Sequence, residues 1–233
     1  MSTVIVGVGG ASCSGKSTLT EWLVKIFPHS AIYHMDKHYL PDSQVPVKNG
    51  ILDWDCAEAL DFNAFVAGLK TLPHKEVESV LSPNRPAISD SQVSSSTVRE
   101  LKDQVRQVLC KRPNTSFWFL DGFLLYWDKR VMDLMNIKIA LHTRYDELKR
   151  RRGTRPGYET IEGYWVEPPN YFDEYVWPNY LKHNKPILKA SGDLEKDQDH
   201  GVLEIDRLTI IDTEICPVEE ALRRAVACIL DQL

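Results

Sequence analysis

Length, composition and charge exclude several classes of protein. The 233 residues suffice for one α/β domain with a sizeable core, and no linker rich in Pro, Gly or Ser divides them. The formal net charge of -5 argues against an extended nucleic-acid surface, because such a surface requires a strongly basic face. The five cysteines are scattered without C-x-x-C spacing, which indicates neither a disulfide framework nor a zinc site and favours a reducing compartment.

The same features predict a single domain, residues 1–233, that is soluble and cytoplasmic. No run of about 18 consecutive apolar residues is present, and the N-terminus leads directly into an apolar segment without the basic region of a signal peptide. We therefore expect small-molecule partners, no nucleic acid, no membrane, and a monomer or weak homodimer.

The first predicted element is a buried strand at residues 4–8, followed by a phosphate-binding pattern. Residues 10–17 read G-x-x-x-x-G-K-S. The glycines let backbone N–H groups converge on phosphate oxygens, Lys16 can reach the outer phosphates, and the hydroxyl of Ser17 suits Mg²⁺. Helical spacing of apolar side chains over residues 19–27 predicts a helix whose N-terminus faces the anion, which disfavours the alternative of a glycine-rich turn without a ligand. The residues expected to bind the nucleotide are Gly10, Ala11, Ser12, Cys13, Ser14, Gly15, Lys16, Ser17 and Thr18.

Two carboxylates follow apolar strands of the prediction. Residues 31–35 predict a second strand that leads into Asp36, and the wholly apolar residues 117–120 predict a central strand that leads into Asp121. Because ligands of a parallel sheet bind at the carboxyl ends of its strands, we expect both carboxylates close to the phosphate-binding loop. Asp121 has the Walker-B position, in which a carboxylate holds Mg²⁺ directly or through water. The alternative for both is an Asp that caps a strand-to-helix turn.

The remaining segments predict alternating helices and strands. Irregular structure is expected over residues 37–55, a helical period begins at Ala57, and residues 73–81 fit either a short helix or a strand. Such alternation indicates an α/β fold, a parallel sheet with helices on both faces. The other predicted segments are a surface loop at 82–97, a polar helix at 98–109, a strand at 137–141, a basic helix at 145–152, a loop at 153–172, a solvated loop at 192–201, a strand at 208–211 and an amphipathic helix at 218–229.

A basic cluster at residues 149–155 favours a small-molecule kinase among the proteins that have such a loop. The chain contains no N-K-x-D motif for guanine recognition, which disfavours a GTPase. Arginines on a helix and its exit can clamp a transferring phosphate and its developing charge. We expect this role for Arg151, Arg152 and Arg155 in a lid at about residues 150–170, while Lys149 and Arg150 lie in solvent.

Further segments complete a more specific pattern, which resembles the nicotinamide riboside kinases, relatives of the uridine kinases, over nearly the whole chain. The segments are Gly10–Thr18, Met35–Asp36 with Tyr39, Asn49–Asp55, Glu58–Leu60, Asp121–Leu125, Lys149–Arg155, Pro169–Asp173 and Val176–Pro178. The resemblance implies an α/β fold of the P-loop NTPase type with a small lid, in a single kinase domain over residues 1–233. It also implies use of ATP and Mg²⁺.

The resemblance implies roles at both ends of a ribose. Asp36 would hydrogen-bond the 5′-hydroxyl, and Asp55 with Arg152 would bind the 2′- and 3′-hydroxyls. Trp54 and Tyr158 would sandwich the pyridine ring, although both also fit simple packing roles. The implied catalytic residues are Asp36, Lys16 and Arg152, the metal ligands are Ser17 and Asp36, and Arg151 and Arg155 would face ATP, with the loop after Asp212 bordering adenine. The implied substrate-binding residues are Asp36, Lys37, His38, Tyr39, Trp54, Asp55, Asp121, Arg152, Tyr158 and Glu159.

Two features depart from the family pattern. Lys37 stands where the family often has a second acidic residue, so it would contact phosphate or shift the substrate preference. The loop at residues 156–168 is longer than in shorter family members, and its Trp165 is a second candidate for stacking on the base in place of Tyr158.

The predicted function is therefore phosphorylation of the 5′-hydroxyl of nicotinamide riboside, with nicotinic acid riboside as a further candidate substrate, in NAD salvage. A uridine or cytidine kinase is the alternative, because sheet, loop and lid would be shared. A non-catalytic nucleotide-binding regulator is a third possibility. Lys16, Ser17, Asp36 and Arg152 argue against it, whereas Lys37 keeps it open.

Overall fold

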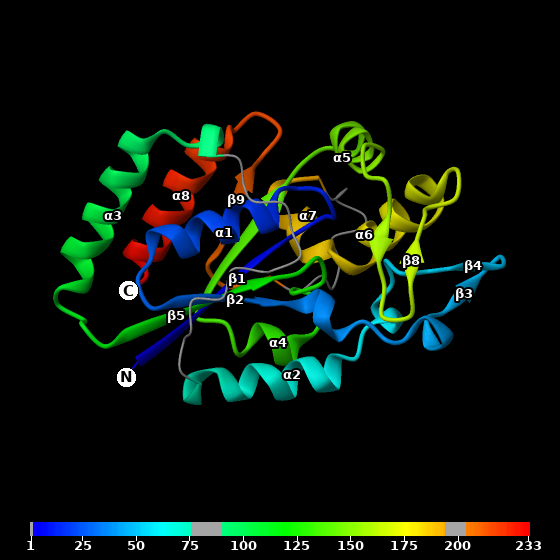
Figure 1. Ribbon diagram of the computed structural model, residues 1–233, viewed down its shortest axis with the longest axis horizontal. Coiled ribbons are helices and arrows are strands. Elements are labelled where there is room, and N and C mark those ends of the chain that lie inside the picture. Colours follow the sequence, from blue (N-terminus) through cyan, green and yellow to red (C-terminus); the bar gives the residue numbers. More distant parts are fainter. Residues whose placement is uncertain (1, 76–89, 194–203) are drawn as a thin grey trace.

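A five-stranded parallel sheet forms the centre of the protein (Figure 1). The computed structural model describes residues 2–75, 90–193 and 204–233. The strand order is β2-β5-β1-β6-β9, and every neighbouring pair runs parallel, which confirms the predicted α/β sheet. The strands are β1 (Ser2–Gly10), β2 (Ser30–His34), β5 (Thr115–Asp121), β6 (Ile137–His142) and β9 (Leu208–Asp212).

Helices cover both faces of this sheet. In Figure 1, α1 (Lys16–Ile26), α3 (Ser95–Leu109) and α8 (Val218–Asp231) lie above it, whereas α2 (Phe62–Thr71) and α4 (Lys129–Met132) lie below. Both faces of the inner strands are apolar: Val6 and Val8 of β1 pack in one buried cluster with α1, α3 and α8, while Ile5 packs in the other with α2. Burial on both faces explains the wholly apolar runs in β1 and β5.

A smaller layer extends from the carboxyl ends of the strands, on the right in Figure 1. Its aromatic core is separate from the two sheet clusters and includes Tyr171 and Tyr175, whose rings stack at a centroid distance of 4.8 Å. The layer contains the hairpins β3 (Val47–Lys48) with β4 (Ile51–Leu52) and β7 (Tyr158–Glu159) with β8 (Tyr164–Trp165), the helix α5 (Tyr145–Arg152), a π-helical turn at Phe172–Val176, and α6 (Trp177–His183); α7 (Lys185–Ser191) then packs against β6 and β9.

Several element boundaries differ from the prediction for local reasons. The polar helix α3 begins at Ser95 rather than at residue 98, because the hydroxyl of Ser94 accepts a hydrogen bond from the N–H of Thr97 at 3.2 Å. The helical period expected from residue 57 becomes a 3-10 turn at Ala57–Ala59 and then α2, capped by the carboxylate of Asp61.

Two segments expected to be loops contain short hairpins. Residues 37–55 include β3 and β4, joined by Asn49 and Gly50 with φ of 52° and 78°, as a two-residue hairpin turn requires. Residues 153–172 include β7 and β8. The expectations for residues 76–89 and 194–201 lie outside the described part of the chain.

Candidate active site

The loop between β1 and α1 has the shape of an anion cradle. Gly10 has a φ of 134°, and a Cβ there would lie 2.3 Å from the carbonyl oxygen of Leu141. Gly15, with a φ of 98°, forms the N-cap of α1, so both positions require glycine. The first turn of α1 leaves backbone N–H groups without helical partners and turns the positive end of the helix toward the cavity. Lys16 folds back over the loop, donating from Nζ to the carbonyl of Ala11 at 2.7 Å.

Both predicted carboxylates lie beside this loop. The hydroxyl of Ser17 donates to Oδ2 of Asp121 at 2.6 Å, and Nδ1 of His34 lies 3.2 Å from the same oxygen. Burial lowers the pKa of Lys16, while the nearby carboxylates of Asp121 and Asp36 oppose that change. The structure thus brings Lys16 and Ser17, which follow β1, together with Asp36 after β2 and Asp121 at the end of β5.

A single cavity of about 1420 Å³ joins the loop to the lid. Asp36 lines it near Lys16, and Asp55 lines it together with Arg152. The two acidic residues assigned to opposite ends of the ribose therefore open into one space. The lining comprises residues 12–19, Glu21, Asp36, Tyr39, Trp54, Asp55, Gln92, Asp121, Phe123, Leu141, Arg151, Arg152, Arg155, residues 157–161, Tyr164, Trp165, residues 213–218 and Ala221.

Asp55 and Arg152 form a buried, bidentate ion pair. Nη1 of Arg152 donates to Oδ1 of Asp55 at 3.0 Å, and Nη2 donates to Oδ2 at 2.9 Å. Both residues are only 6% exposed. On its other side, Arg152 donates from Nε to Glu167 at 2.7 Å, a partner that the sequence analysis did not identify.

The segment that carries Asp55 is anchored from the lid side. The hydroxyl of Tyr171 accepts from the N–H of Trp54 at 2.9 Å and lies 3.1 Å from the carbonyl of Leu52. Asn179 donates to both carboxylate oxygens of Asp53, at 2.8 and 3.0 Å. Burial raises the pKa of Asp53, and the bond from Asn179 works against that rise. The only sequence signal for these anchors was that Tyr171 and Asn179 lie in or beside segments of the family pattern.

Aromatic rings form one wall of the cavity. Trp54 lies 5.6 Å from Tyr39 and 6.4 Å from Trp165, measured between ring centroids. Tyr158 also lines the cavity, but its ring faces the guanidinium carbons of Arg152 at 5.3 Å and Arg155 at 5.6 Å. Of the two candidates for stacking opposite Trp54, Trp165 is the one whose ring lies near it, tilted by 56°.

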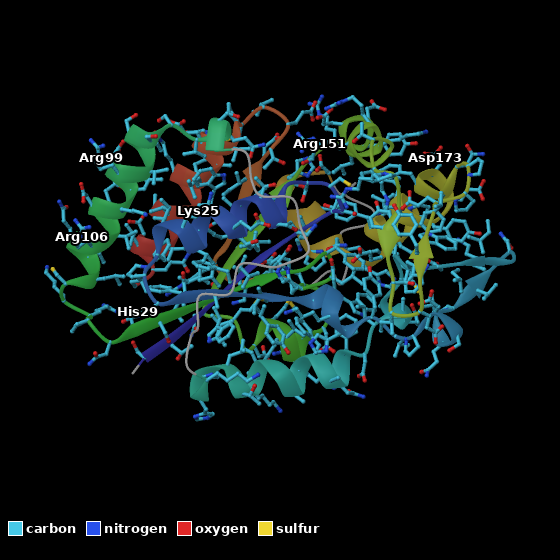
Figure 2. All side chains as sticks on the ribbon, in the orientation of Figure 1. Lys25, His29, Arg99, Arg106, Arg151 and Asp173 are labelled. Atoms are coloured by element: carbon cyan, nitrogen blue, oxygen red, sulfur yellow. The ribbon has the colours of Figure 1, made fainter. Side chains whose placement is uncertain are left out.

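Arg151, in the last turn of α5 and labelled at the top of Figure 2, connects three parts of the site. It donates to Glu147 at 2.7 Å, to the carbonyl of Cys13 at 3.4 Å and to the carbonyl of Thr213 at 3.2 Å. Its guanidinium therefore bridges the phosphate-binding loop and the loop after β9. The neighbouring Lys149 is turned outward to Asp173, labelled in the same figure.

Lys37 and His38 are not brought to the cavity wall. The side chain of Lys37 is exposed, and Nε2 of His38 lies 3.0 Å from the hydroxyl of Tyr33, on the side of α2. Lys37 follows Asp36 in the 3-10 turn at Met35–His38 and is not among the residues that line the cavity, which the sequence pattern did not reveal. Glu159 lines the cavity as expected, whereas Gly10 and Ala11 lie behind its wall.

The oxygen donors beside the loop fit a hard divalent cation. Within the described residues, no group of three or more His, Cys, Asp or Glu side chains is arranged to hold a metal. Mg²⁺ is commonly held by only one or two protein oxygens together with nucleotide phosphates, and the hydroxyl of Ser17 with the carboxylates of Asp36 and Asp121 supplies such donors.

Comparison with known proteins identifies the family. The nicotinamide riboside kinase of Schizosaccharomyces pombe is 37% identical over 234 residues, covering 99% of this chain and 98% of that protein. The chain belongs to the nicotinamide riboside kinase family. The nicotinamide riboside kinase of Saccharomyces cerevisiae is 30% identical over 82% of this chain and 81% of its own length. Human nicotinamide riboside kinase 2 is 32% identical over 81% of this chain and 70% of its own length.

Family membership confirms the resemblance drawn from the motifs, and a nicotinamide riboside kinase is a phosphotransferase that acts on an alcohol group. No family model matches the chain. Within the described residues, none of the helices has the length and apolar character needed to cross a membrane.

Proposed function

We propose that this protein transfers the terminal phosphate of ATP to the 5′-hydroxyl of nicotinamide riboside, with nicotinic acid riboside as a second candidate substrate, in NAD salvage. The observation that carries this proposal is the single cavity with Asp36 beside the phosphate-binding loop and the Asp55–Arg152 pair at its other end. Relatives named nicotinamide riboside kinase support the choice of substrate.

Asp36 is the group assigned to the reacting hydroxyl. An alcohol is far less acidic than a carboxylic acid of pKa about 4, so removal of its proton before the transfer is disfavoured. Asp36 instead orients the hydroxyl and accepts its proton late in a loose transition state. Lys16, Arg151 and Arg155 lie where they can offset the charge that develops on the transferring phosphate.

Ser17 and Asp36 are the residues that we propose hold Mg²⁺ beside the nucleotide. By donating its proton to Asp121, the hydroxyl of Ser17 keeps the lone pairs of its oxygen for the cation and holds Asp121 beside it. Bound Mg²⁺ would supply charge neutralisation on the phosphate oxygens.

The aromatic wall suits a flat, positively charged ring. The pyridine ring of nicotinamide riboside is a cation, and aromatic faces attract a cation by about 0.5 to 2 kcal/mol each. Trp54 and Trp165 therefore favour this riboside over a neutral pyrimidine nucleoside. The predicted stacking of Tyr158 remains a prediction.

The experiment that tests this function measures ADP formation with ATP and Mg²⁺ in the presence of nicotinamide riboside, uridine or no nucleoside. We expect rapid, riboside-dependent turnover and slower turnover with uridine. Faster turnover with uridine or cytidine would favour the pyrimidine nucleoside kinase, and ADP formation indifferent to nucleoside would favour a regulatory ATPase.

Replacement of Asp36 separates chemistry from nucleotide binding. We expect Asp36→Asn to reduce kcat by about 10²- to 10⁴-fold, the usual contribution of a proton-accepting group, while ATP binding measured by calorimetry persists. Asp103→Asn, on the exposed side of α3, is the matched control and should retain full activity. Wild-type kcat in Asp36→Asn would remove Asp36 from the mechanism.

We further propose that the protein acts in the cytoplasm as a monomer or weak homodimer. All five cysteines are free thiols in the structure, as a reducing compartment favours. Size-exclusion chromatography with light scattering measures the oligomeric state.

A further inference from the structure

Arg152 is held by two carboxylates, only one of which lines the cavity. Asp55 binds the Nη1–Nη2 end of the guanidinium, at 3.0 and 2.9 Å. Glu167 lies along the adjacent Nε–Nη2 edge, where its Oε1 accepts from Nε at 2.7 Å and lies 2.5 Å from Nη2. Glu167 comes from the segment after β8 and lies outside the cavity lining.

Glu167 occupies a donor of Arg152 that Asp55 does not reach. A guanidinium has five N–H groups in one rigid plane. Asp55 takes one hydrogen of Nη1 and one of Nη2, and Glu167 takes the Nε–H through Oε1, which also lies 2.5 Å from Nη2. The second hydrogen of Nη1 is engaged by neither carboxylate and is left for a ligand. With both edges occupied, the plane cannot rotate about its long axis without breaking bonds on both sides.

The burial of Arg152 makes this second partner necessary. The side chain of Arg152 is 6% exposed and that of Glu167 19% exposed, so water has little access to the bonded edge. A buried donor without a partner is costly, whereas a paired one is held in place. Removal of the Glu167 carboxylate would leave Nε–H unpaired, and the guanidinium would turn to satisfy it, shifting its bonds to Asp55.

We propose that Glu167 is a positioning residue for the ribose site, holding Arg152 so that its remaining N–H and the Asp55 carboxylate meet the 2′- and 3′-hydroxyls without reorganisation. The inference rests on the proposed function and deepens it by assigning a residue outside the cavity to sugar recognition. Preorganised donors bind without a reorganisation cost, so the effect belongs to riboside affinity.

The test compares Glu167→Ala with Glu167→Gln. We expect Glu167→Ala to raise the KM for nicotinamide riboside by about tenfold or more, with the KM for ATP unchanged and kcat changed less than KM. Selectivity for the riboside over its 2′-deoxy analogue should fall, because the deoxy analogue already lacks part of this contact. Glu167→Gln keeps an acceptor for Nε–H and should recover part of the affinity. Glu174→Ala, an exposed residue of the same lid layer, is the matched control.

The outcomes separate this inference from the proposed function. If wild-type protein turns over nicotinamide riboside and Glu167→Ala shows the same KM and the same selectivity, the positioning role is wrong. Equal losses toward ATP, riboside and deoxyriboside would indicate general damage to the lid and would also overturn it. A wild-type protein that neither binds nor phosphorylates the riboside overturns the proposed function, and the inference with it. Calorimetric ATP binding verifies that each variant is folded.

Discussion

At the residue scale, the pairing of Asp55 with Arg152 prepares a site for two adjacent hydroxyls. Each oxygen of Asp55 accepts one bond from Arg152 and keeps a lone pair for another donor. Two acceptors on one carboxylate match the spacing of a vicinal diol. A site built in this way rejects a ligand that lacks one hydroxyl, because a buried polar group is then left unpaired.

This arrangement predicts the effect of Asp55→Asn on sugar selectivity. The amide keeps the shape of the carboxylate but offers one acceptor oxygen instead of two and no charge for Arg152. We expect the preference for nicotinamide riboside over its 2′-deoxy analogue, up to about 10⁴ in kcat/KM for the wild type, to shrink by at least about tenfold. Asp133→Asn, at the end of α4, is the control. An unchanged ratio of kcat/KM values would contradict the assignment of Asp55 to the sugar.

At the element scale, reciprocal hydrogen bonds fasten the lid hairpin to the turn before β3. The carboxylate of Asp42 accepts from the hydroxyl of Thr160 at 2.8 Å and from the N–H of Glu162 at 3.4 Å. The carboxylate of Glu162 in return accepts from the N–H of Ser43 at 3.1 Å. We call these bonds among Asp42, Ser43, Thr160 and Glu162 the clasp. The clasp holds β7 and β8, and therefore Trp165, over the cavity.

Opening the clasp should weaken riboside binding without altering chemistry. Glu162→Ala removes bonds at an exposed surface, each worth about 0.5 to 1.5 kcal/mol, so we expect a KM for the riboside several-fold higher at unchanged kcat. Cleavage after Tyr164 or Trp165 by chymotrypsin should be faster in the variant. Glu214→Ala, on the loop after β9, tests whether loss of any acidic side chain at the cavity rim has the same effect. Wild-type proteolysis and KM in Glu162→Ala would show that the hairpin is held by other contacts.

At the scale of the whole molecule, we propose that residues 1–233 form one domain with the lid layer attached. The sheet has a buried apolar cluster on each face. The lid layer combines two segments that are far apart in the sequence, around residues 47–55 and 158–183. Unfolding should therefore occur in a single transition.

Acid should destabilise this fold through His183, which is 1% exposed. Neither ring nitrogen has a hydrogen-bond partner among the described residues, and Trp127 lies edge-on at 4.4 Å. Burial lowers the pKa of His183 to about 4, below its value of about 6.5 in an unfolded chain. Between these two pKa values the unfolded state binds more protons than the folded state. The stability that the fold gains from a neutral His183 is therefore fully present above about pH 6.5 and is lost as the pH falls toward 4.

The measurement is the free energy of unfolding in urea between about pH 7 and pH 5. We expect His183→Leu to show a shallower loss of stability on acidification than the wild type. His74→Gln, at an exposed position, should keep the wild-type slope. Equal slopes for His183→Leu and the wild type would assign acid sensitivity to other groups.

The sequence by itself determined the features that depend on neighbouring residues. Local patterns of glycine, apolar runs and helical spacing predict three features: the phosphate-binding loop, the strands that lead into Asp36 and Asp121, and the helix at residues 145–152. The parallel order of the strands then requires their carboxyl ends to meet, so the position of both carboxylates beside the loop followed as well.

Only the tertiary structure decided which distant side chains meet. Asp55 and Arg152 are 97 residues apart, and their common partner Glu167, the clasp at Asp42 and the placement of Trp165 against Trp54 depend on how the lid layer packs. Lys37, next to Asp36 in sequence, lies outside the cavity lining, because successive residues of a 3-10 turn project in directions about 120° apart. Contacts of this kind depend on how whole elements pack against one another, and a local sequence pattern does not predict that packing.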